Sequence, residues 1–316
     1  MKGYILKRLL SLIPVLLVVA VVVFLLMHIT PGDPAAVILG PEASPAEVAE
    51  LREELGLNKP PIEQFVSWFG NVLQGDFGTS IFMKQPVSQA FFEHLGPTLS
   101  LAIMAQVLAI VVAIPLGVLA AKFRGSILDQ TFMGISLLGI SVPSFLLGLF
   151  LILLVGVELK WLPVAGYKSI DAGLLNHIKY LILPAIALGS MQAALIARMT
   201  RSSMLDVLNA NYIKTARSKG VKETIIVIKH TLRNAFIPIL TIIGQTFGTL
   251  VAGAAVVETV FNIPGIGQLI INSVERRDFA VIQGSVLLIA VSYVLINLVI
   301  DLLYGVIDPR VRLGRK

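Results

Sequence analysis

The sequence contains no cysteine and only four histidines, and both scarcities exclude classes of function. Without cysteine the chain cannot form disulfides, thiolate metal sites or iron–sulfur clusters. The histidines lack the spacing of metal ligands, so no metal site is expected; they are His28, His94, His177 and His230. No Gly-x-x-x-x-Gly-Lys-Ser/Thr segment occurs, which predicts that the chain itself binds no nucleotide. No nucleophile–base arrangement is evident either, so we expect no catalytic residue.

Charged side chains are also scarce, at 14% of 316 residues, whereas hydrophobic residues make up 56%. Soluble domains carry about a quarter charged residues. The mean hydropathy is +0.87, and the charges are bunched between long apolar runs. This pattern is typical of a polytopic membrane protein, so we predict an all-α fold. Six transmembrane helices are predicted, near 9–29, 98–121, 131–157, 180–199, 236–258 and 284–305.

The distribution of lysine and arginine predicts the orientation in the membrane. Of the 25 basic residues, 17 lie in segments 1–8, 122–130, 198–235 and 306–316, which alternate with segments on the other side. Lysine and arginine accumulate in cytoplasmic loops. We therefore predict that both termini are cytoplasmic in a multi-pass inner-membrane protein. The first apolar run is long enough to span and no small-x-small cleavage site follows it, which favours an uncleaved helix.

Segment 30–97 is the largest predicted extramembrane piece, and its sequence indicates a small helical cap. Ser44-Pro45-Ala46-Glu47 is a capping box with proline at the first helical position, and Gly56 is placed to end that helix. The cap contains nine acidic and three basic residues, so its face is acidic. That face is either a solvated surface or a docking surface for an external partner. We divide the chain into 1–97, the first helix plus cap, and 98–316, a five-helix core.

The basic segment 198–235 carries the strongest functional signal. It contains eight lysines and arginines, yet short helical periodicities flank Gly220. We predict a helix, a glycine turn and a second helix on the cytoplasmic side. An ordered, half-apolar hairpin needs a partner to bury it, whereas a loop lying on the bilayer surface would explain the charges alone.

The hairpin also resembles a known motif. Residues 214–220 are similar to the EAA loop of ABC-importer permeases, with Lys214 and Thr215 replacing its first two letters. This variant resembles the dipeptide/oligopeptide/nickel permease family, which has Tyr-x-x-Thr-Ala-x-x-Lys-Gly followed by His-x-Leu-Arg-Asn-Ala-x-Ile-Pro. The chain matches at Tyr212, Thr215, Ala216, Lys219, Gly220, His230, Leu232, Arg233, Asn234, Ala235, Ile237 and Pro238.

The resemblance extends over essentially the full length. Further segments resemble family signatures: Pro31-Gly32-Asp33-Pro34, Gly75-Asp76-Phe77-Gly78, Val260 to Gly267, Arg277-Asp278 and Asp308-Pro309-Arg310. The short 158–179 loop and the cap most resemble dipeptide and glutathione permeases. The fold implied is that of a type I ABC-importer permease.

The resemblance implies partners and a coupling role for the hairpin. The partners would be a homologous second permease, two ATPase subunits that bind ATP and magnesium, and an extracytoplasmic solute-binding protein. The hairpin would insert into an ATPase cleft and couple ATP-driven closure to the membrane helices. The coupling residues would be Tyr212, Lys214, Thr215, Ala216, Arg217, Lys219 and Gly220. The substrate would be a short peptide, such as a dipeptide, an oligopeptide or glutathione, moved by alternating access.

Two further groups of residues are candidates for the pathway. Uncharged polar positions within spans could line it, namely Gln106, Ser136, Ser141, Ser144, Ser190, Gln192, Gln245 and Thr249. The turn-rich loop 259–283 could form an outer gate or a docking site for the binding protein, or be a plain connecting turn. Its candidate residues are Phe261, Pro264, Gly265, Arg277 and Asp278.

Two alternatives stay open. A nickel chelate or another small solute is the nearest alternative substrate within the family. A proton-coupled secondary transporter is the rival class, but such carriers keep several ionisable groups at membrane depth. In the predicted spans Asp301 is the exception to a nearly uncharged interior, so the rival is disfavoured.

Overall fold

The computed structural model describes the backbone of residues 2–29, 32–40 and 42–307, and the side chains of 13–29, 32–40 and 42–300. Within these residues the chain is helical and forms no strand beyond one isolated β-bridge, between Thr79 and Pro86. The all-α prediction is confirmed. Asp301, and the signature segment 308–310, lie outside the described side chains.

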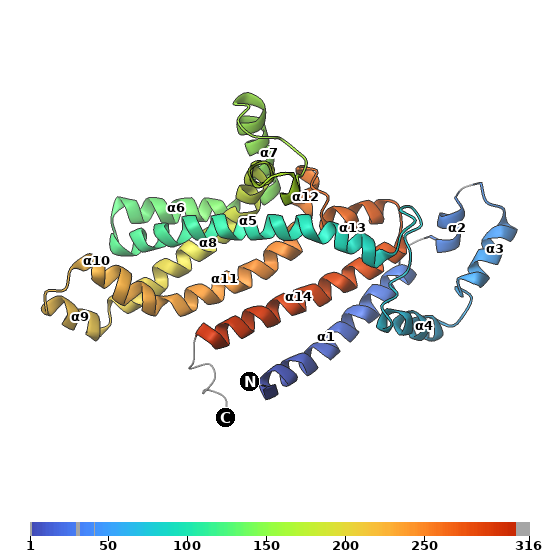
Figure 1. Ribbon diagram of the computed structural model, residues 1–316, viewed down its shortest axis with the longest axis horizontal. Coiled ribbons are helices and arrows are strands. Elements are labelled where there is room, and N and C mark those ends of the chain that lie inside the picture. Colours follow the sequence, from blue (N-terminus) through green and yellow to red (C-terminus); the bar gives the residue numbers. More distant parts are fainter. Residues whose placement is uncertain (1, 30–31, 41, 308–316) are drawn as a thin grey trace. The chain divides into compact units, whose positions relative to one another are not determined.

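The chain divides into two compact units, which we describe separately (Figure 1). The first comprises residues 1–96 and 268–298, with α1 (Lys2–Ile29), α2 (Pro34–Leu39), α3 (Pro45–Glu54), α4 (Pro61–Leu73), the start of α5 (Val87–Lys122), most of α13 (Ile266–Glu275) and most of α14 (Phe279–Ile307). The second comprises 97–267 and 299 onward, with the rest of α5, α6 (Ile127–Ser141), α7 (Ser144–Leu151), α8 (Leu174–Leu208), α9 (Asn211–Ser218), α10 (Glu223–Ile225), α11 (Arg233–Gly253) and α12 (Ala255–Val260). The sequence-based division at residue 97 stays a prediction.

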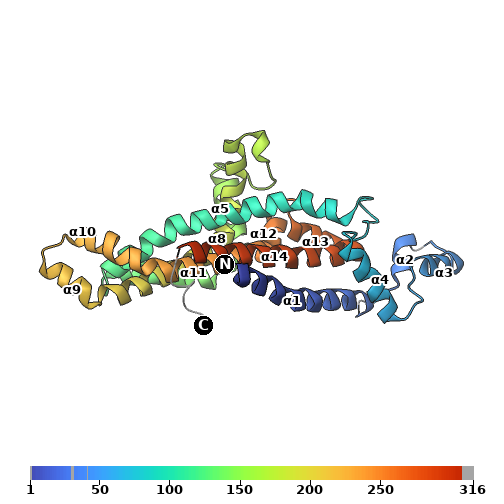
Figure 2. The same cartoon turned by 60° about the horizontal axis from the view of Figure 1, so that its bottom comes forward.

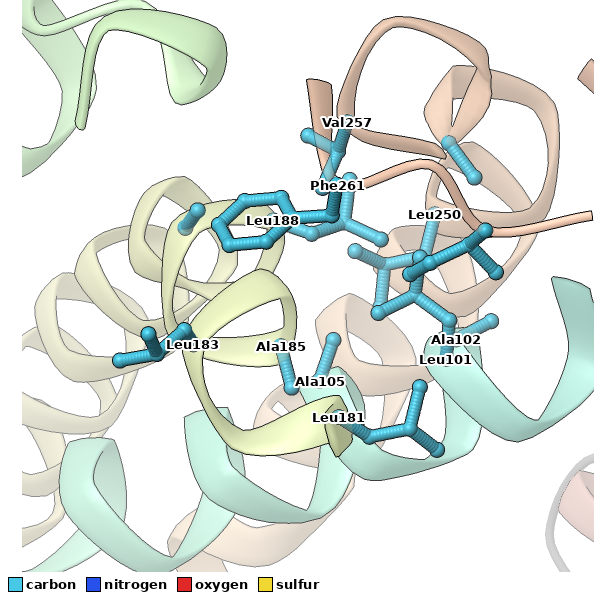
Figure 3. Packing of buried hydrophobic residues seen from close by; sticks show 13 residues of the cluster. Leu101, Ala102, Ala105, Leu181, Leu183, Ala185, Leu188, Leu250, Val257 and Phe261 are labelled. Carbon is cyan, nitrogen blue, oxygen red and sulfur yellow. The ribbon is translucent and has the colours of Figure 1, made fainter. Parts of the chain in front are cut away.

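In the second unit α8 is the central helix, and α6, α7 and α11 pack on it (Figure 2). Its contact with α5 is close because Gly189 has no side chain; a Cβ there would lie 2.7 Å from the carbonyl oxygen of Ala105. Small residues at such crossings let membrane helices approach closely. Figure 3 shows the apolar cluster that results, in which Leu101 and Ala105 of α5 meet Leu181 and Leu188 of α8.

The predicted span 131–157 is not one continuous helix. It consists of α6 and of α7 with its π-helical extension Ile152–Glu158, and the two parts are bent by 102°. The break occurs at Val142, which has extended backbone (φ −85°, ψ 121°). Pro143 follows, and the ring of a proline disfavours helical backbone in the residue before it.

This bend affects the number of spans. Four helices of the described chain are long and apolar enough to cross a membrane, or five if the bent pair counts as one. The described side chains of α1 begin at residue 13, so only 17 residues of this 28-residue helix enter that count. The six-span topology stays a prediction.

In the first unit the segment predicted as a cap forms the short helices α2, α3 and α4, and α3 has the ends predicted for it. Ser44 and Glu47 make the capping box at the start of α3: each side chain accepts a hydrogen bond from the other's backbone N–H. The hydrogen bonds that the Glu47 carboxylate accepts from the backbone N–H and from the hydroxyl of Ser44 lower the pKa of Glu47. Gly56 follows the end of α3 with φ +68°, as a helix-terminating glycine should. Rings of α4 pack on α1, with the Phe24 and Phe65 centroids 5.3 Å apart.

Candidate functional site

The basic hairpin, residues 198–235, consists of the end of α8, then α9, a turn at Gly220, α10, the π-helix Ile226–Leu232 and the start of α11. Figures 1 and 2 show α9 and α10 at one end of the second unit. The predicted order of helix, glycine turn and helix is confirmed. The π-helical stretch was not foreseen, because wider helical turns have no sequence signature of their own. Such segments are frequent at functional sites.

One face of α9 is anchored and the other is exposed. The side chain of Ile213 is fully buried, while that of Tyr212 keeps 46% of its surface exposed. Ala216 is half-buried, and Lys214 and Thr215 are exposed. The helix therefore presents one aromatic side chain and several polar ones to a prospective partner while one isoleucine holds it in place.

The turn at Gly220 is a Schellman motif. The N–H of Gly220 donates to the carbonyl of Arg217 (2.9 Å), and the N–H of Val221 donates to the carbonyl of Ala216 (3.2 Å). Gly220 has φ +72°, a conformation in which glycine avoids the penalty of a Cβ. A Cβ added there would meet no atom within 4 Å, so the turn faces open space. The backbone conformation of the turn thus favours glycine at this position, and the exposed turn has room for a partner protein to pack against it.

Arg217 is paired within the hairpin. Its Nε and Nη2 donate to the two carboxylate oxygens of Glu223 at 3.2 and 2.8 Å, which joins α9 to α10 across the turn. This pairing raises the pKa of Arg217. Both side chains remain about half exposed, so the pair braces the turn only modestly. The lysines 214, 219 and 222 are exposed and have no ion pair among the described residues.

The base of the hairpin is tied to α6 by a second, better-buried ion pair. Arg201 of α8 donates from Nε and Nη2 to the two oxygens of Asp129, at 2.6 and 2.8 Å. The Asp129 side chain is 5% exposed and also accepts from the N–H of Gly125. Sequence analysis missed this pair, because the partners are 72 residues apart and each charge lies in a segment rich in others.

Apolar packing connects the hairpin to the long helices. Met204 of α8, Val227 of the π-helix and Ile239 of α11 belong to one buried cluster, together with Ala113 and Ala121 of α5. Interiors packed in this way transmit displacement, since close-packed side chains have low compressibility. A movement of the hairpin would therefore be passed to α5, α8 and α11.

The predicted pathway residues lie on α5, α6, α7, α8 and α11, and their role in a pathway stays a prediction. Gln106 is buried, and its Oε1 accepts from Thr246 (3.4 Å), a residue that the sequence did not single out. The Nε2 of Gln106 is buried without a hydrogen-bond partner in the described part of the chain. Gln192 is buried, Gln245 and Thr249 are exposed, and Ser136, Ser141, Ser144 and Ser190 differ in exposure. Ser190 and Thr249 donate to carbonyls of their own helices.

In loop 259–283, Phe261 and Gly265 are part of the interior of the second unit. Phe261 is 1% exposed and lies in the apolar cluster of Figure 3. Gly265 packs on the carboxylate of Glu258, so that a Cβ there would clash with it. Glu258 is fully buried and accepts from Thr98 (2.6 Å), whose Oγ1 in turn accepts from the N–H of Ile266 (2.8 Å). Pro264 is exposed.

Glu258, which directly precedes this loop, was not singled out from the sequence. The signal was a single carboxylate inside the apolar run Val-Val-Glu-Thr-Val. It was missed because Glu258 was counted as the last residue of the predicted span 236–258. The structure ends α11 at Gly253 and begins α12 at Ala255, so Glu258 lies beyond the long helix.

The other two loop candidates belong to the first unit, where three signature segments converge at the start of α14. Asp278 is 1% exposed, accepts from Ser80 (2.6 Å) and from the N–H of Val281, and so caps α14. The Arg277 guanidinium lies against Gly32, where a Cβ would be 2.7 Å from Nη1. Phe77 packs against Gly284 of α14. Asp278 thus ties the start of α14 to the segment around Ser80, and a gating or docking role for these residues stays a prediction.

Comparison with known proteins agrees with this architecture. Residues 113–313 match the family described as "Binding-protein-dependent transport system inner membrane component", and residues 1–102 match its N-terminal membrane component. A permease of the methionine transporter MetNI, solved in inward-facing conformations, superimposes with a TM-score of 0.58 at 21% identity, over 70% of this chain and 97% of that one. That likeness shows the fold.

Sequence relatives match over almost the full length. The chain is 46% identical to the "Probable peptide ABC transporter permease protein y4tP" of Sinorhizobium fredii, over 99% of this chain and all of the relative. It is 47% identical to the glutathione transport system permease protein GsiC of Salmonella typhimurium and 46% identical to GsiC of Escherichia coli K12, in both cases over 99% of each chain. The chain is therefore a permease subunit of an ABC importer and belongs to the family of binding-protein-dependent transport system inner membrane components.

Proposed function

We propose that the chain forms one half of an alternating-access pathway for short peptides, with glutathione as the first substrate to test. The observation that carries the substrate class is the match over nearly the full chain to relatives named as glutathione and peptide permeases. The other half would be a homologous permease. An extracytoplasmic binding protein would deliver the peptide, and two separate ATPase subunits would bind ATP and magnesium. Both termini of this chain would be cytoplasmic.

The basic hairpin would be the contact with the ATPases. Its geometry supports this role, because an exposed Tyr212, three exposed lysines and an open glycine turn stand out from a buried anchor at Ile213. The buried cluster of Met204, Val227 and Ile239 continues from the hairpin into the long helices. ATP binding would close the ATPases and displace the hairpin, and the packed helices would then rearrange around the pathway.

Uptake by the purified complex tests the substrate class. The tagged chain is purified in mild detergent with its partners, reconstituted into vesicles, and supplied with ATP and a binding protein loaded with glutathione, a dipeptide or a nickel chelate. We expect ATP-dependent uptake of glutathione or peptide and recovery of a second permease and two ATPases. If only the chelate is taken up with ATP, the substrate is the chelate and not a peptide. Uptake driven by a proton gradient without ATP would contradict the proposal.

A pair of glycine variants tests the coupling role. Gly220→Asp adds a charged side chain on the open turn at a backbone cost of about 1 kcal/mol. Gly75→Asp is the matched control, because Gly75 also has positive φ (+87°), ends a helix in the same motif and has open space for a Cβ. We expect both variants to assemble, and only Gly220→Asp to lose peptide-stimulated ATP hydrolysis and uptake. Equal activity of the two variants would remove the coupling assignment.

A further inference from the structure

Helix α4 has an apolar surface that is wider than the face it uses for packing. Its rings Phe65 and Trp68 pack on Phe24 of α1, with centroids 5.3 and 5.9 Å away. Beside this contact, Ile62, Val66 and Leu73 are exposed, at 78%, 64% and 73%. Large apolar side chains exposed in a row are a sign of an interaction surface.

The residues of α4 fall into three faces. With about 100° per residue, Ile62, Val66 and Leu73 lie within about 40° of one another. The face that meets α1 borders them on one side, through Phe65. The polar residues Glu63, Ser67 and Asn71 are all exposed and form the third face. It lies between the exposed apolar face and the face that meets α1, roughly opposite Phe69. A helix with one exposed apolar face and one exposed polar face is typical of the interface between the bilayer and water.

The position of α4 along α1 identifies that boundary. Phe24 is five residues before Ile29, where α1 ends, so α4 lies beside the last turns of α1, as Figures 1 and 2 show. The last turns of a membrane-spanning helix lie where the hydrocarbon core meets the headgroups. Around Phe24 the surface of α1 is itself apolar and exposed, at Val22, Leu25 and Leu26. With about 100° per residue these three side chains lie about 100–160° around α1 from Phe24. Both helices therefore expose apolar side chains near the end of α1, beside the face through which they pack on each other.

The length of α4 excludes a span. Its 13 residues cover about 20 Å, whereas a transmembrane helix needs about 20 residues. From these observations we propose that α4 is an interfacial helix, whose Ile62, Val66 and Leu73 enter the bilayer at the end of α1 while Glu63, Ser67 and Asn71 face water. Phospholipid is thus the partner that this surface fits, and α4 anchors the cap to the membrane.

The absence of cysteine makes the test direct, since single cysteines can be introduced without further changes. Cysteines at 62, 66 and 73, and at the matched polar positions 63, 67 and 71, are each labelled with a nitroxide in the assembled transporter. The complex is reconstituted in vesicles of phosphatidylethanolamine and phosphatidylglycerol. Electron paramagnetic resonance then measures collisions with oxygen, which concentrates in lipid, and with a water-soluble nickel chelate.

We expect the ratio of oxygen to nickel collisions to be several-fold higher at 62, 66 and 73 than at 63, 67 and 71. Two results would overturn the proposal: nickel access at the apolar positions, which would place them in water, and access to neither probe, which would mean that protein covers them. If one variant fails to assemble, the remaining positions of each face still give the comparison. The outcome does not depend on which solute the transporter carries.

Discussion

At the residue scale, the ion pair of Asp129 and Arg201 joins α6 to α8 through a nearly buried carboxylate. Both oxygens of Asp129 are bonded to the guanidinium, and a backbone N–H completes the site. The carboxylate is nearly inaccessible, whereas the Arg201 side chain keeps 27% exposure. Breaking such a pair leaves one desolvated charge without compensation, which is more harmful than replacing both partners by apolar groups.

We therefore expect Arg201→Met, which leaves the nearly inaccessible carboxylate of Asp129 unpaired, to lower the free energy of unfolding by about 3 kcal/mol, the lower end for a buried pair. The double variant Asp129→Leu/Arg201→Met should recover most of that loss because it leaves no unpaired charge. The measurement is unfolding of the purified chain in detergent by titration with dodecyl sulfate, followed by circular dichroism. If the double variant is as unstable as the single one, the loss of stability does not come from an unpaired charge, and the expectation is wrong.

At the element scale, the contact of α5 with α8 depends on glycine where no side chain fits. The carbonyl of Ala105 would lie 2.7 Å from a Cβ at Gly189, and a backbone atom cannot move away as a flexible side chain can. Gly117, further along α5, meets Thr200 and Ala197 of α8 in the same manner. The two glycines thus set the separation of these helices at two points of their contact.

Gly189→Ala should force the helices apart and destabilise the chain by roughly 1–3 kcal/mol, as overpacking does. Gly134→Ala is the matched control, because Gly134 is inside α6 and has nothing within 4 Å of a Cβ. Alanine is the better helix former, so this variant should be neutral or more stable by up to about 1 kcal/mol. The same detergent titration compares the stabilities of the two variants. Equal stabilities would contradict the expectation that the close contact at Gly189 leaves no room for a side chain.

At the scale of the whole molecule, the orientation in the membrane is open to a direct test. Ser169, in the loop before α8, and Ser218, in the basic hairpin, are both exposed. The distribution of lysine and arginine predicts that they lie on opposite sides of the membrane. Single cysteines at the two positions, in a chain without others, should react differently with a membrane-impermeant maleimide added to intact cells.

We expect Ser169→Cys to be labelled in intact cells and Ser218→Cys only after the membrane is permeabilised. Labelling of Ser218→Cys from outside would reverse the topology and remove the hairpin from the side where ATP is available.

Much of the architecture, including the glycine turn of the basic hairpin, could be predicted from local signals. The capping box at Ser44, the helix-ending Gly56 and the left-handed turn at Gly220 were all predicted, because each depends on residues only a few positions apart. Over 131–157 the sequence predicted one span, and the structure bends it by 102° at Pro143. A proline indicates that a helix is interrupted, but the angle is set by how α7 packs on α8.

The amino-acid sequence by itself determined the class of protein, the helical fold and the place of the basic hairpin, since hydropathy, charge bunching and turn residues act over short stretches of chain. Only the tertiary structure decided which distant groups meet. It paired Asp129 with Arg201, buried Glu258 against Gly265, and joined Asp278 to Ser80 across 198 residues. The physical reason is that such contacts depend on how whole helices pack, and a local pattern carries no record of its distant partner.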